Sequence, residues 1–153
     1  MRLGLSILPC ILLAACLTEP HRCVDTPSDP ATQQFAPALG IDLTTMEKTE
    51  LGDYRKDLVL GTGAALTTLR MVEIHYSAYL PDGTLVDQII DQPYPLDLGT
   101  RATVGLADGM LGMAEGGQRL IVVPSENALG PCGNGGIPGN STIVYTVELL
   151  TID

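Results

Sequence analysis

The sequence predicts an α+β fold in which an antiparallel β-sheet packs against a single short helix. Residues 71–80 and 141–152 alternate apolar and polar side chains, which is the pattern of half-buried strands. Only residues 103–113 place apolar side chains at mostly helical spacings. The 17 glycines and 11 prolines are typical of a chain rich in loops. Many strands with one helix indicate the α+β class with an antiparallel sheet.

An entry strand and a hairpin are the first predicted elements. Residues 53–60 read as a strand that ends at the glycine-rich turn of residues 61–63. Residues 71–80 form the next strand. Pro81-Asp82-Gly83 then supplies a turn, because proline presets its own φ and glycine tolerates a positive one. Residues 84–86 return antiparallel to the preceding strand and complete the hairpin.

The remaining elements are predicted from shorter segments. Residues 103–113 form one short helix, which Gly109 and Gly112 weaken because glycine has a low helix propensity. Residues 118–123 form a β-branched strand that ends at Pro124. The other segments, in chain order, are a short strand over 94–98, a turn over 125–129, a glycine-rich loop over 130–139 and a closing strand over 141–152.

The N-terminus has the pattern of an export signal. Met1-Arg2 is followed by an uncharged run over residues 3–12 and by Leu13-Ala14-Ala15-Cys16. A positive start, a short apolar core and small residues before a cleavage site describe an exported precursor, and the run is too short to span a bilayer. Cys16 resembles the lipobox cysteine of bacterial lipoproteins, which is lipidated and becomes the new N-terminus. The alternative is an ordinary secretory signal with a chance cysteine.

These features predict three parts of the chain and a location. Residues 1–15 form a lipoprotein signal peptide, residues 16–45 a lipid-anchored flexible linker, and residues 46–153 the folded domain. The linker is predicted because residues 17–36 are rich in proline and polar side chains and almost lack periodic apolar residues. We expect a lipid-anchored protein of the cell envelope that faces the periplasm. Leu17, rather than aspartate, after the lipidation site favours the outer membrane.

The charge balance limits the classes of partner. The chain has 18 acidic and 8 basic residues, so its formal net charge is −10. Nucleic acids and anionic lipid surfaces both require basic protein surface, and neither is therefore expected as a partner. We expect membrane attachment through the N-terminal lipid only, because no second apolar run is long enough to span a bilayer.

Cysteine usage leaves one open question. Of the four cysteines, Cys10 lies in the signal and Cys16 is the expected lipidation site. Cys23 and Cys132 remain, and outside the cytoplasm they can pair or stay free, because the sequence does not give the distance between them. His21 lies near Cys23, but no second Cys/His cluster with ligand spacing follows. No metal and no cofactor are expected.

Two segments carry a resemblance to a known family. One is the run Gly109-Met-Leu-Gly-Met-Ala-Glu-Gly-Gly-Gln-Arg-Leu-Ile-Val-Val-Pro124. It is followed by Ser-Glu-Asn-Ala-Leu-Gly130, by Ile137-Pro138 and by Val144–Leu150. The other is the hairpin from Val72 to Asp87. From about residue 50 to its end the chain resembles the FKBP family of peptidyl-prolyl isomerases. The resemblance implies a twisted antiparallel β-sheet wrapped around one short α-helix.

The resemblance also implies an activity that needs no covalent step. An apolar cleft between helix and sheet would take a peptidyl-proline, whose amide rotation has a barrier of about 18–20 kcal/mol. Twisting the C–N bond destroys the amide resonance and lowers the polarity of the carbonyl, so a water-poor pocket favours the twisted state. The implied partners are proline-containing proteins or peptides, together with ligands of the tacrolimus and rapamycin kind. A monomer is expected.

The resemblance assigns catalytic roles to four side chains. Tyr76 and Asp87 stand where the family has its hairpin tyrosine and its carbonyl-facing aspartate, and Tyr94 and Tyr145 occupy aromatic wall positions. Ile137 matches a substrate-binding loop isoleucine that leans over the proline ring. Without the family pattern, Tyr76 and Tyr145 would read as core tyrosines and Asp87 as a turn residue.

Other expected substrate-binding positions depart from the family pattern. Val86 replaces a phenylalanine of the wall, Leu106 replaces the tryptophan of the pocket floor, and Leu129 replaces a tyrosine whose hydroxyl grips the substrate. Either Thr103 or Val104 supplies the backbone N–H that binds the ligand. These departures define an alternative function, a catalytically weak or inactive FKBP-like lipoprotein that binds peptides as a chaperone. A structural envelope lipoprotein is a third possibility.

Overall fold

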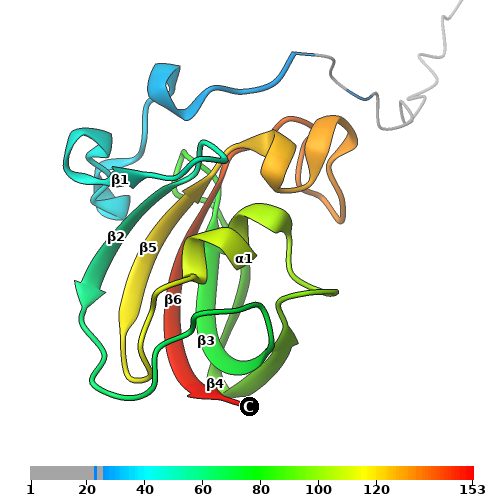
Figure 1. Cartoon of the computed structure of the whole chain (residues 1–153). Helices are drawn as coiled ribbons and strands as arrows, with labels where there is room; N and C mark the ends of the chain where they lie inside the picture. The colour runs from blue at the N-terminus through cyan, green and yellow to red at the C-terminus, as the bar shows by residue number, and fades with distance from the viewer. Residues whose placement is uncertain (1–22, 24–25) are drawn as a thin grey trace, which may run out of the picture.

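One antiparallel sheet of six strands forms the centre of the computed structural model, which describes residue 23 and residues 26–153 (Figure 1). Its order is β1-β2-β5-β6-β3-β4, and every neighbouring pair is antiparallel. This sheet and its short helix confirm the predicted fold class. The expected signal peptide over 1–15 and the lipidation site Cys16 lie outside the described residues. The strands are β1 (Glu47–Lys48), β2 (Tyr54–Val59), β3 (Met71–Tyr79), β4 (Leu85–Asp97), β5 (Gln118–Val123) and β6 (Ile143–Ile152).

The helix α1 (Val104–Met110) lies in front of the sheet in Figure 1 and packs on β5. It ends before the predicted limit at residue 113, and Gly112 has a φ of +83°. Two helical glycines set its distance from the sheet. A Cβ at Gly105 would lie 2.3 Å from a methyl carbon of Val123, and one at Gly109 would lie 2.5 Å from a methyl carbon of Ile121. The residues that lower helix propensity therefore let α1 lie close to β5.

Strand β5 is buried on both of its faces. Ile121 and Val123 pack in the main core with α1, whereas Leu120 and Val122 belong to a second apolar cluster. Successive side chains of a strand point to opposite faces, so the two clusters lie on opposite sides of the sheet. This double burial explains why the β5 sequence is almost continuously apolar rather than alternating.

The second cluster corrects the boundary of the expected flexible linker over 16–45. Three 3₁₀ helices occupy its C-terminal half, and apolar side chains from residues 35–46 pack on Tyr54 and Val144. The Ala36 backbone N–H also donates to the Pro81 carbonyl at 2.8 Å. The sequence did not predict this packing, because the apolar residues of this segment follow neither a helical nor a strand period. The three helices are η1 (Pro30–Thr32), η2 (Pro37–Leu39) and η3 (Leu43–Thr45).

Strand β4 corrects a second expectation. The sequence predicts separate strands over 84–86 and 94–98, but Leu85–Asp97 is one strand of 13 residues. Its pairing with β3 shifts register between Ile74 and Tyr76, so the apolar alternation breaks in the middle of the strand. β4 lies at the sheet edge, where a strand tolerates prolines, which have no backbone N–H to donate.

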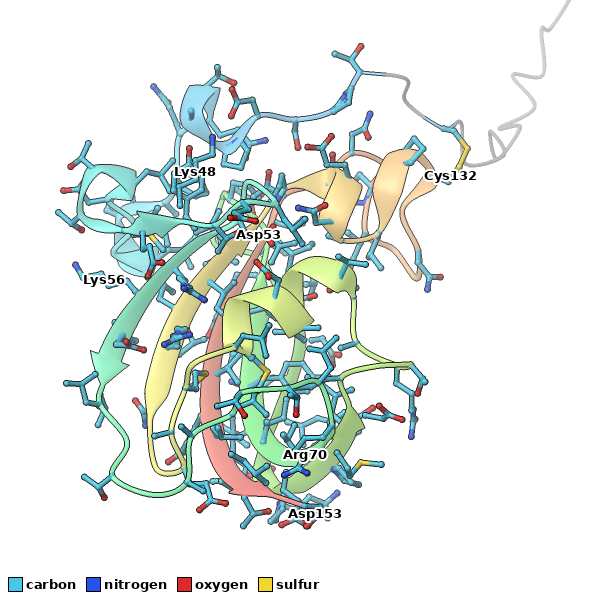
Figure 2. The ribbon with its side chains drawn as sticks, viewed as in Figure 1. Lys48, Asp53, Lys56, Arg70, Cys132 and Asp153 are labelled. Atoms are coloured by element: carbon cyan, nitrogen blue, oxygen red, sulfur yellow. A yellow bond between two sulfur atoms is a disulfide. The ribbon has the colours of Figure 1, made fainter. Side chains whose placement is uncertain are left out.

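A disulfide joins the N-terminal segment to the loop after β5. Cys23 and Cys132 are bonded across 109 residues of sequence, which decides the pairing that the sequence left open (Figure 2). Cys132 is the last residue of η5 (Gly130–Cys132), which follows η4 (Ser125–Asn127). Within the described part of the chain, no helix has the length and apolar character required to cross a membrane.

Candidate functional site

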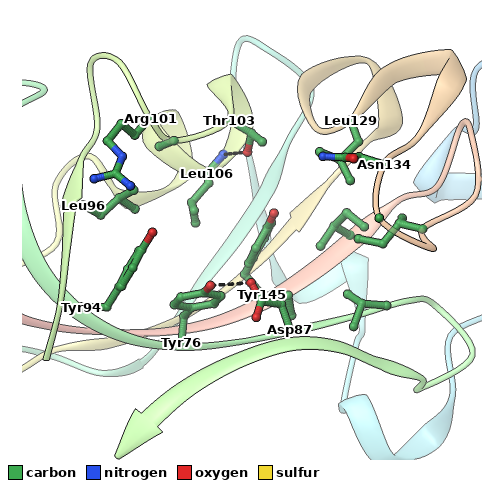
Figure 3. A pocket seen from close by; sticks show the side chains of 16 residues that line it. Tyr76, Asp87, Tyr94, Leu96, Arg101, Thr103, Leu106, Leu129, Asn134 and Tyr145 are labelled. Atoms are coloured by element: carbon green, nitrogen blue, oxygen red, sulfur yellow. Dashed lines mark hydrogen bonds between the residues drawn. The ribbon is translucent and has the colours of Figure 1, made fainter. Parts of the chain in front are cut away.

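An open cleft of about 350 Å³ lies between α1, the strands β3, β4 and β6, and the loop that follows β5 (Figure 3). The sheet supplies one wall, and the entry to α1 and the loop supply the other. Sixteen residues line this cleft: Tyr76, Ala78, Val86, Asp87, Tyr94, Leu96, Arg101, Ala102, Thr103, Leu106, Leu129, Asn134, Gly135, Ile137, Ile143 and Tyr145.

The strand register explains how the sheet wall forms. Ala78 on β3 pairs with Asp87 on β4 and with Tyr145 on β6, so these side chains share one face of the sheet. The methyl group of Ala78 is small, and it leaves space between its two larger neighbours. The cleft therefore opens where a short side chain lies between Asp87 and Tyr145.

A hydrogen bond fixes two polar groups in the sheet wall. The Tyr76 hydroxyl donates to Asp87 Oδ2 at 2.5 Å, and the Gln88 backbone N–H donates to Asp87 Oδ1 at 2.9 Å (Figure 3). Burial, followed by the Asp87 carboxylate, raises the pKa of Tyr76. The Tyr76 hydroxyl consequently stays protonated at neutral pH and presents a fixed dipole to the cleft.

The other two tyrosines provide aromatic surface. The rings of Tyr76 and Tyr94 are tilted by 57° with centroids 5.8 Å apart, within the range of favourable aromatic pairs. Tyr145 is almost entirely buried, and this burial raises its pKa. Figure 3 shows the three rings along the same side of the cleft, facing Thr103 and Leu106.

The loop wall begins at the N-terminus of α1. The Thr103 hydroxyl accepts a hydrogen bond from the Leu106 backbone N–H at 3.4 Å, so Thr103 caps the helix and directs Leu106 into the cleft. Leu106 is only 7% exposed, while Leu129 lines the cleft from the loop after β5. Leu106 and Leu129 therefore lie at the site, as does Val86, the third position that departs from the family pattern.

Arg119 holds α1 in position from behind. Its Nη1 donates to the carbonyl oxygens of Gly109 and Leu111 at 2.9 Å, and its Nε donates to Asp57 Oδ1 at 2.7 Å. These bonds satisfy carbonyls at the helix C-terminus that have no partner within the helix. The buried guanidinium thus ties the helix end to β2 and β5.

The structure brings together nine of the ten expected catalytic and substrate-binding residues. The exception is Val104, which was one of two alternatives for the ligand-binding backbone N–H. Its side chain is 62% exposed and lines a separate hollow on the other side of α1. The reason is its place after the cap, because a helix turns the next side chain away from the face that Thr103 and Leu106 share. The nine are Tyr76, Val86, Asp87, Tyr94, Thr103, Leu106, Leu129, Ile137 and Tyr145.

Sequence reasoning missed several residues of the cleft. Leu96 follows Tyr94 by two positions in a strand, so the alternation of side chains contained the signal that would have found it. Arg101 and Asn134 lie in irregular loops, where no periodicity indicates which way a side chain points. Within the residues that the structure describes, no group of three or more His, Cys, Asp and Glu side chains has the geometry to hold a metal ion.

Comparisons with known proteins agree with this arrangement. The family model described as "FKBP-type peptidyl-prolyl cis-trans isomerase" matches residues 63–150. A protein named "FK506-binding protein" from Neisseria meningitidis serogroup B is 37% identical over 101 residues, which cover 63% of this chain and 93% of that protein. The "FKBP-type peptidyl-prolyl cis-trans isomerase FkpA" of Aeromonas hydrophila is 33% identical over 109 residues, covering 71% of this chain and 41% of that protein.

The fold also matches solved structures. The crystal structure of FkpA from Escherichia coli superposes with a TM-score of 0.66 at 30% identity, and the match covers 71% of this chain and 51% of that one. The match therefore spans about half of the FkpA chain.

Proposed function

Because this chain belongs to the family of FKBP-type peptidyl-prolyl cis-trans isomerases, we propose that it catalyses the cis-trans isomerisation of X-Pro bonds in the cleft of Figure 3. The observation that supports this best is the meeting of nine family-assigned residues around one opening, although they come from three strands, a helix and a loop. A binding site requires side chains from distant segments to meet around one opening, whereas the packing of a core does not require an opening.

The proposed mechanism stabilises a twisted amide without forming a covalent bond. The planar X-Pro amide has a polar carbonyl that water solvates well, and rotation about the C–N bond removes the resonance that causes this polarity. Tyr94, Leu106 and Ile137 surround the proline ring with apolar surface and exclude water. The twisted state loses less solvation on entering such a cleft than the planar state, so the rotation barrier is lower in the cleft than in water. Each reduction of the barrier by about 1.4 kcal/mol raises the rate tenfold.

Tyr76 and Asp87 are proposed to orient the substrate carbonyl. The Tyr76 hydroxyl and the Asp87 carboxylate form one hydrogen-bonded unit at the edge of the cleft. The carbonyl carbon of a twisted amide is more electrophilic than that of a planar one, and a fixed carboxylate nearby favours the positive end of its dipole. Thr103 lies at the start of α1, where a backbone N–H is proposed to bind the part of the substrate peptide that follows the proline.

The activity is tested with the chain from residue 17 onward and a peptide that contains Ala-Leu-Pro-Phe. Stopped-flow or NMR exchange measurements give the isomerisation rate with and without protein. We expect a rate proportional to protein concentration. A rate equal to that of the buffer at saturating protein would contradict catalysis.

A second candidate function is peptide binding without turnover. The observation that favours it is the presence of Leu106 and Leu129 in the cleft, where the family has a tryptophan and a tyrosine. A smaller floor keeps the cleft apolar but reduces its contact with the proline ring, and a lost hydroxyl removes about 0.5–1.5 kcal/mol of hydrogen bonding. Fluorescence anisotropy of a labelled proline peptide separates the two functions, because a binder saturates while the isomerisation rate stays at the buffer value.

We propose the cell envelope as the place of this activity. The support is the export signal over residues 1–15 with Cys16 after it, and the disulfide, which forms and persists in oxidising compartments. Cys16 would carry the lipid, and the outer membrane is the proposed destination. Labelled palmitate should enter the wild-type protein and not the Cys16→Ala variant. Equal labelling of both would rule out this anchor.

The ligand class follows from the same cleft. The similar Neisseria protein is named for binding FK506, and the nine residues suggest that tacrolimus or rapamycin also binds here, with proline-containing proteins as the natural substrates. Isothermal titration should give one site per chain, and light scattering should give the mass of the proposed monomer. Tacrolimus should also inhibit isomerisation at the concentrations at which it binds.

A further inference from the structure

We propose that Arg101 makes the cleft selective for prolines that have an acidic side chain next to them. This inference rests on the proposed function, because it concerns the peptides that the same cleft prefers. It is carried by the position of Arg101, by the absence of an ion pair to it among the residues that the structure describes, and by the charge of the opposite wall.

Arg101 lies in the turn between β4 and α1, at one end of the cleft. Its backbone N–H donates to the Asp97 carbonyl at 2.9 Å, which holds the turn in place. Figure 3 shows its guanidinium beside Leu96 and above Tyr94, directed into the opening. Among the residues that line the cleft, Arg101 has the one basic side chain. A peptide bound along Tyr94 therefore passes this guanidinium.

The guanidinium is available to a ligand. Arg55 pairs with Glu47 at 2.8 Å and Arg119 with Asp57 at 2.7 Å, but Arg101 has no acidic partner within 4.0 Å in the described chain. The nearby Asp97 carboxylate accepts hydrogen bonds from the Gly99 N–H and the Thr100 hydroxyl, and these bonds, followed by the more distant charge of Arg101, lower the pKa of Asp97 without forming an ion pair. Five donors in a planar fork thus remain free to bind a carboxylate in a bidentate manner.

The opposite wall has the opposite charge. Asp87 lies on β4 beyond Tyr76, away from the end of the cleft that Arg101 occupies (Figure 3). An acidic side chain of a substrate is repelled there and attracted at Arg101. The rest of the protein has a net charge that disfavours acidic ligands in general, so the attraction must be local. The cleft is therefore polarised along its length, and this polarity selects both the sequence and the orientation of the peptide.

The expected effect is moderate because Arg101 is exposed to solvent. Exposed charge pairs change a rate or an affinity by about two- to fivefold, and added salt screens them. We therefore expect kcat/KM for glutamate peptides to exceed that for glutamine peptides by about two- to fivefold at low ionic strength. At 1 M salt the ratio should approach one.

The experiment uses two peptide pairs and a protease-free assay. The first pair contains Ala-Glu-Pro-Phe or Ala-Gln-Pro-Phe, and the second contains Ala-Leu-Pro-Glu or Ala-Leu-Pro-Gln, so the acid lies before or after the proline. Arg101→Gln should lower kcat/KM for the glutamate peptides by more than it lowers kcat/KM for the matching glutamine peptides, so that the ratio of the two approaches one. Arg70→Gln is the matched control, because Arg70 does not line the cleft and its loss changes the net charge equally.

The outcomes separate this inference from the proposed function. If the wild-type protein isomerises none of the four peptides, the proposed activity is wrong. If it isomerises glutamine and glutamate peptides equally in both pairs, the activity holds and the selectivity is wrong. A glutamate preference that Arg70→Gln lowers as much as Arg101→Gln would also overturn the proposal, because the attraction would then come from overall charge.

Discussion

The two walls of the cleft are built in different ways. The sheet wall places Tyr76, Asp87 and Tyr145 on paired strands, where the backbone ladder fixes each side chain. The loop wall places Leu106 and Leu129 at a helix entry and in a glycine-rich loop, which depend on caps, a disulfide and side-chain hydrogen bonds. Against the pattern that the family resemblance implies, the sheet wall differs at Val86, and the loop wall differs at Leu106 and Leu129. The two walls therefore differ in what fixes their side chains, which is a backbone ladder in one wall and individual contacts in the other.

The largest expected effect comes from the disulfide, which anchors the loop wall and not the sheet wall. Cross-linking across a loop of this length stabilises the folded state by about 4–5 kcal/mol. Cys132→Ser should lower the free energy of unfolding by about this amount in urea denaturation. Hydrogen exchange should increase more in residues 129–139 than in β3 and β6.

The control for this prediction is Cys23→Ser, which breaks the same bond from the other end. Its loss of stability should equal that of Cys132→Ser and of the double variant. Unfolding of all three at the urea concentration that unfolds the wild-type protein would show that the loop wall does not need the cross-link.

The next effect tests the sheet wall. Tyr76→Phe removes the hydroxyl that donates to Asp87 and leaves the ring in place. A hydrogen bond to a charged group contributes about 1.5–3 kcal/mol when buried, and less at this open position. We expect kcat/KM to fall about tenfold. Tyr79→Phe, on the other face of the sheet, is the control and should keep full activity.

A gain of function tests the loop wall. Leu129→Tyr introduces the hydroxyl that the family has at this position. If it reaches the substrate carbonyl, the added hydrogen bond of about 0.5–1.5 kcal/mol should raise kcat/KM about two- to twelvefold. Leu129→Phe adds the same ring without the hydroxyl. Equal rates for the two variants would indicate that the loop holds residue 129 too far from the substrate to form this bond.

The smallest effect concerns a buried acid beneath the loop wall. Asp53 is fully buried, and Asn127 Nδ2 donates to its Oδ1 at 2.9 Å, which ties η4 to the turn before β2. Burial raises the pKa of Asp53. The folded protein consequently binds this proton more tightly than the unfolded chain, whose carboxyl has a pKa of about 3.9. Stability therefore falls as the pH rises from about 3.9, the pKa in the unfolded chain, toward the raised pKa of Asp53 in the folded protein.

The variant Asp53→Asn tests this pH dependence, since it keeps an oxygen for the Asn127 bond and cannot ionise. It should be more stable than the wild-type protein at pH 7, and the difference should disappear below about pH 3.9, where both forms are neutral. Asp91→Asn, at an exposed site on β4, should show no such difference. A constant gap between Asp53→Asn and wild type at all pH values would contradict the assignment.

The walls also differ in how far the sequence predicted them. The alternation in β3 and β6 identified the face that contains Tyr76 and Tyr145, because strand side chains alternate with a period of two. In the loop wall, the sequence left Thr103 and Val104 as equal alternatives, and it did not indicate Arg101. A loop has no period, so the direction of each side chain depends on contacts that are distant in sequence.

The sequence by itself determined the fold class, the strands β3, β5 and β6, the helix and the family, because local periodicity and turn chemistry act over a few residues. Only the tertiary structure decided that β4 is continuous across its bulge, that apolar side chains of residues 35–46 pack on the sheet, and that Cys23 bonds Cys132. These features join segments up to 109 residues apart. Their energies come from burial and pairing between segments, which no local pattern in one segment records.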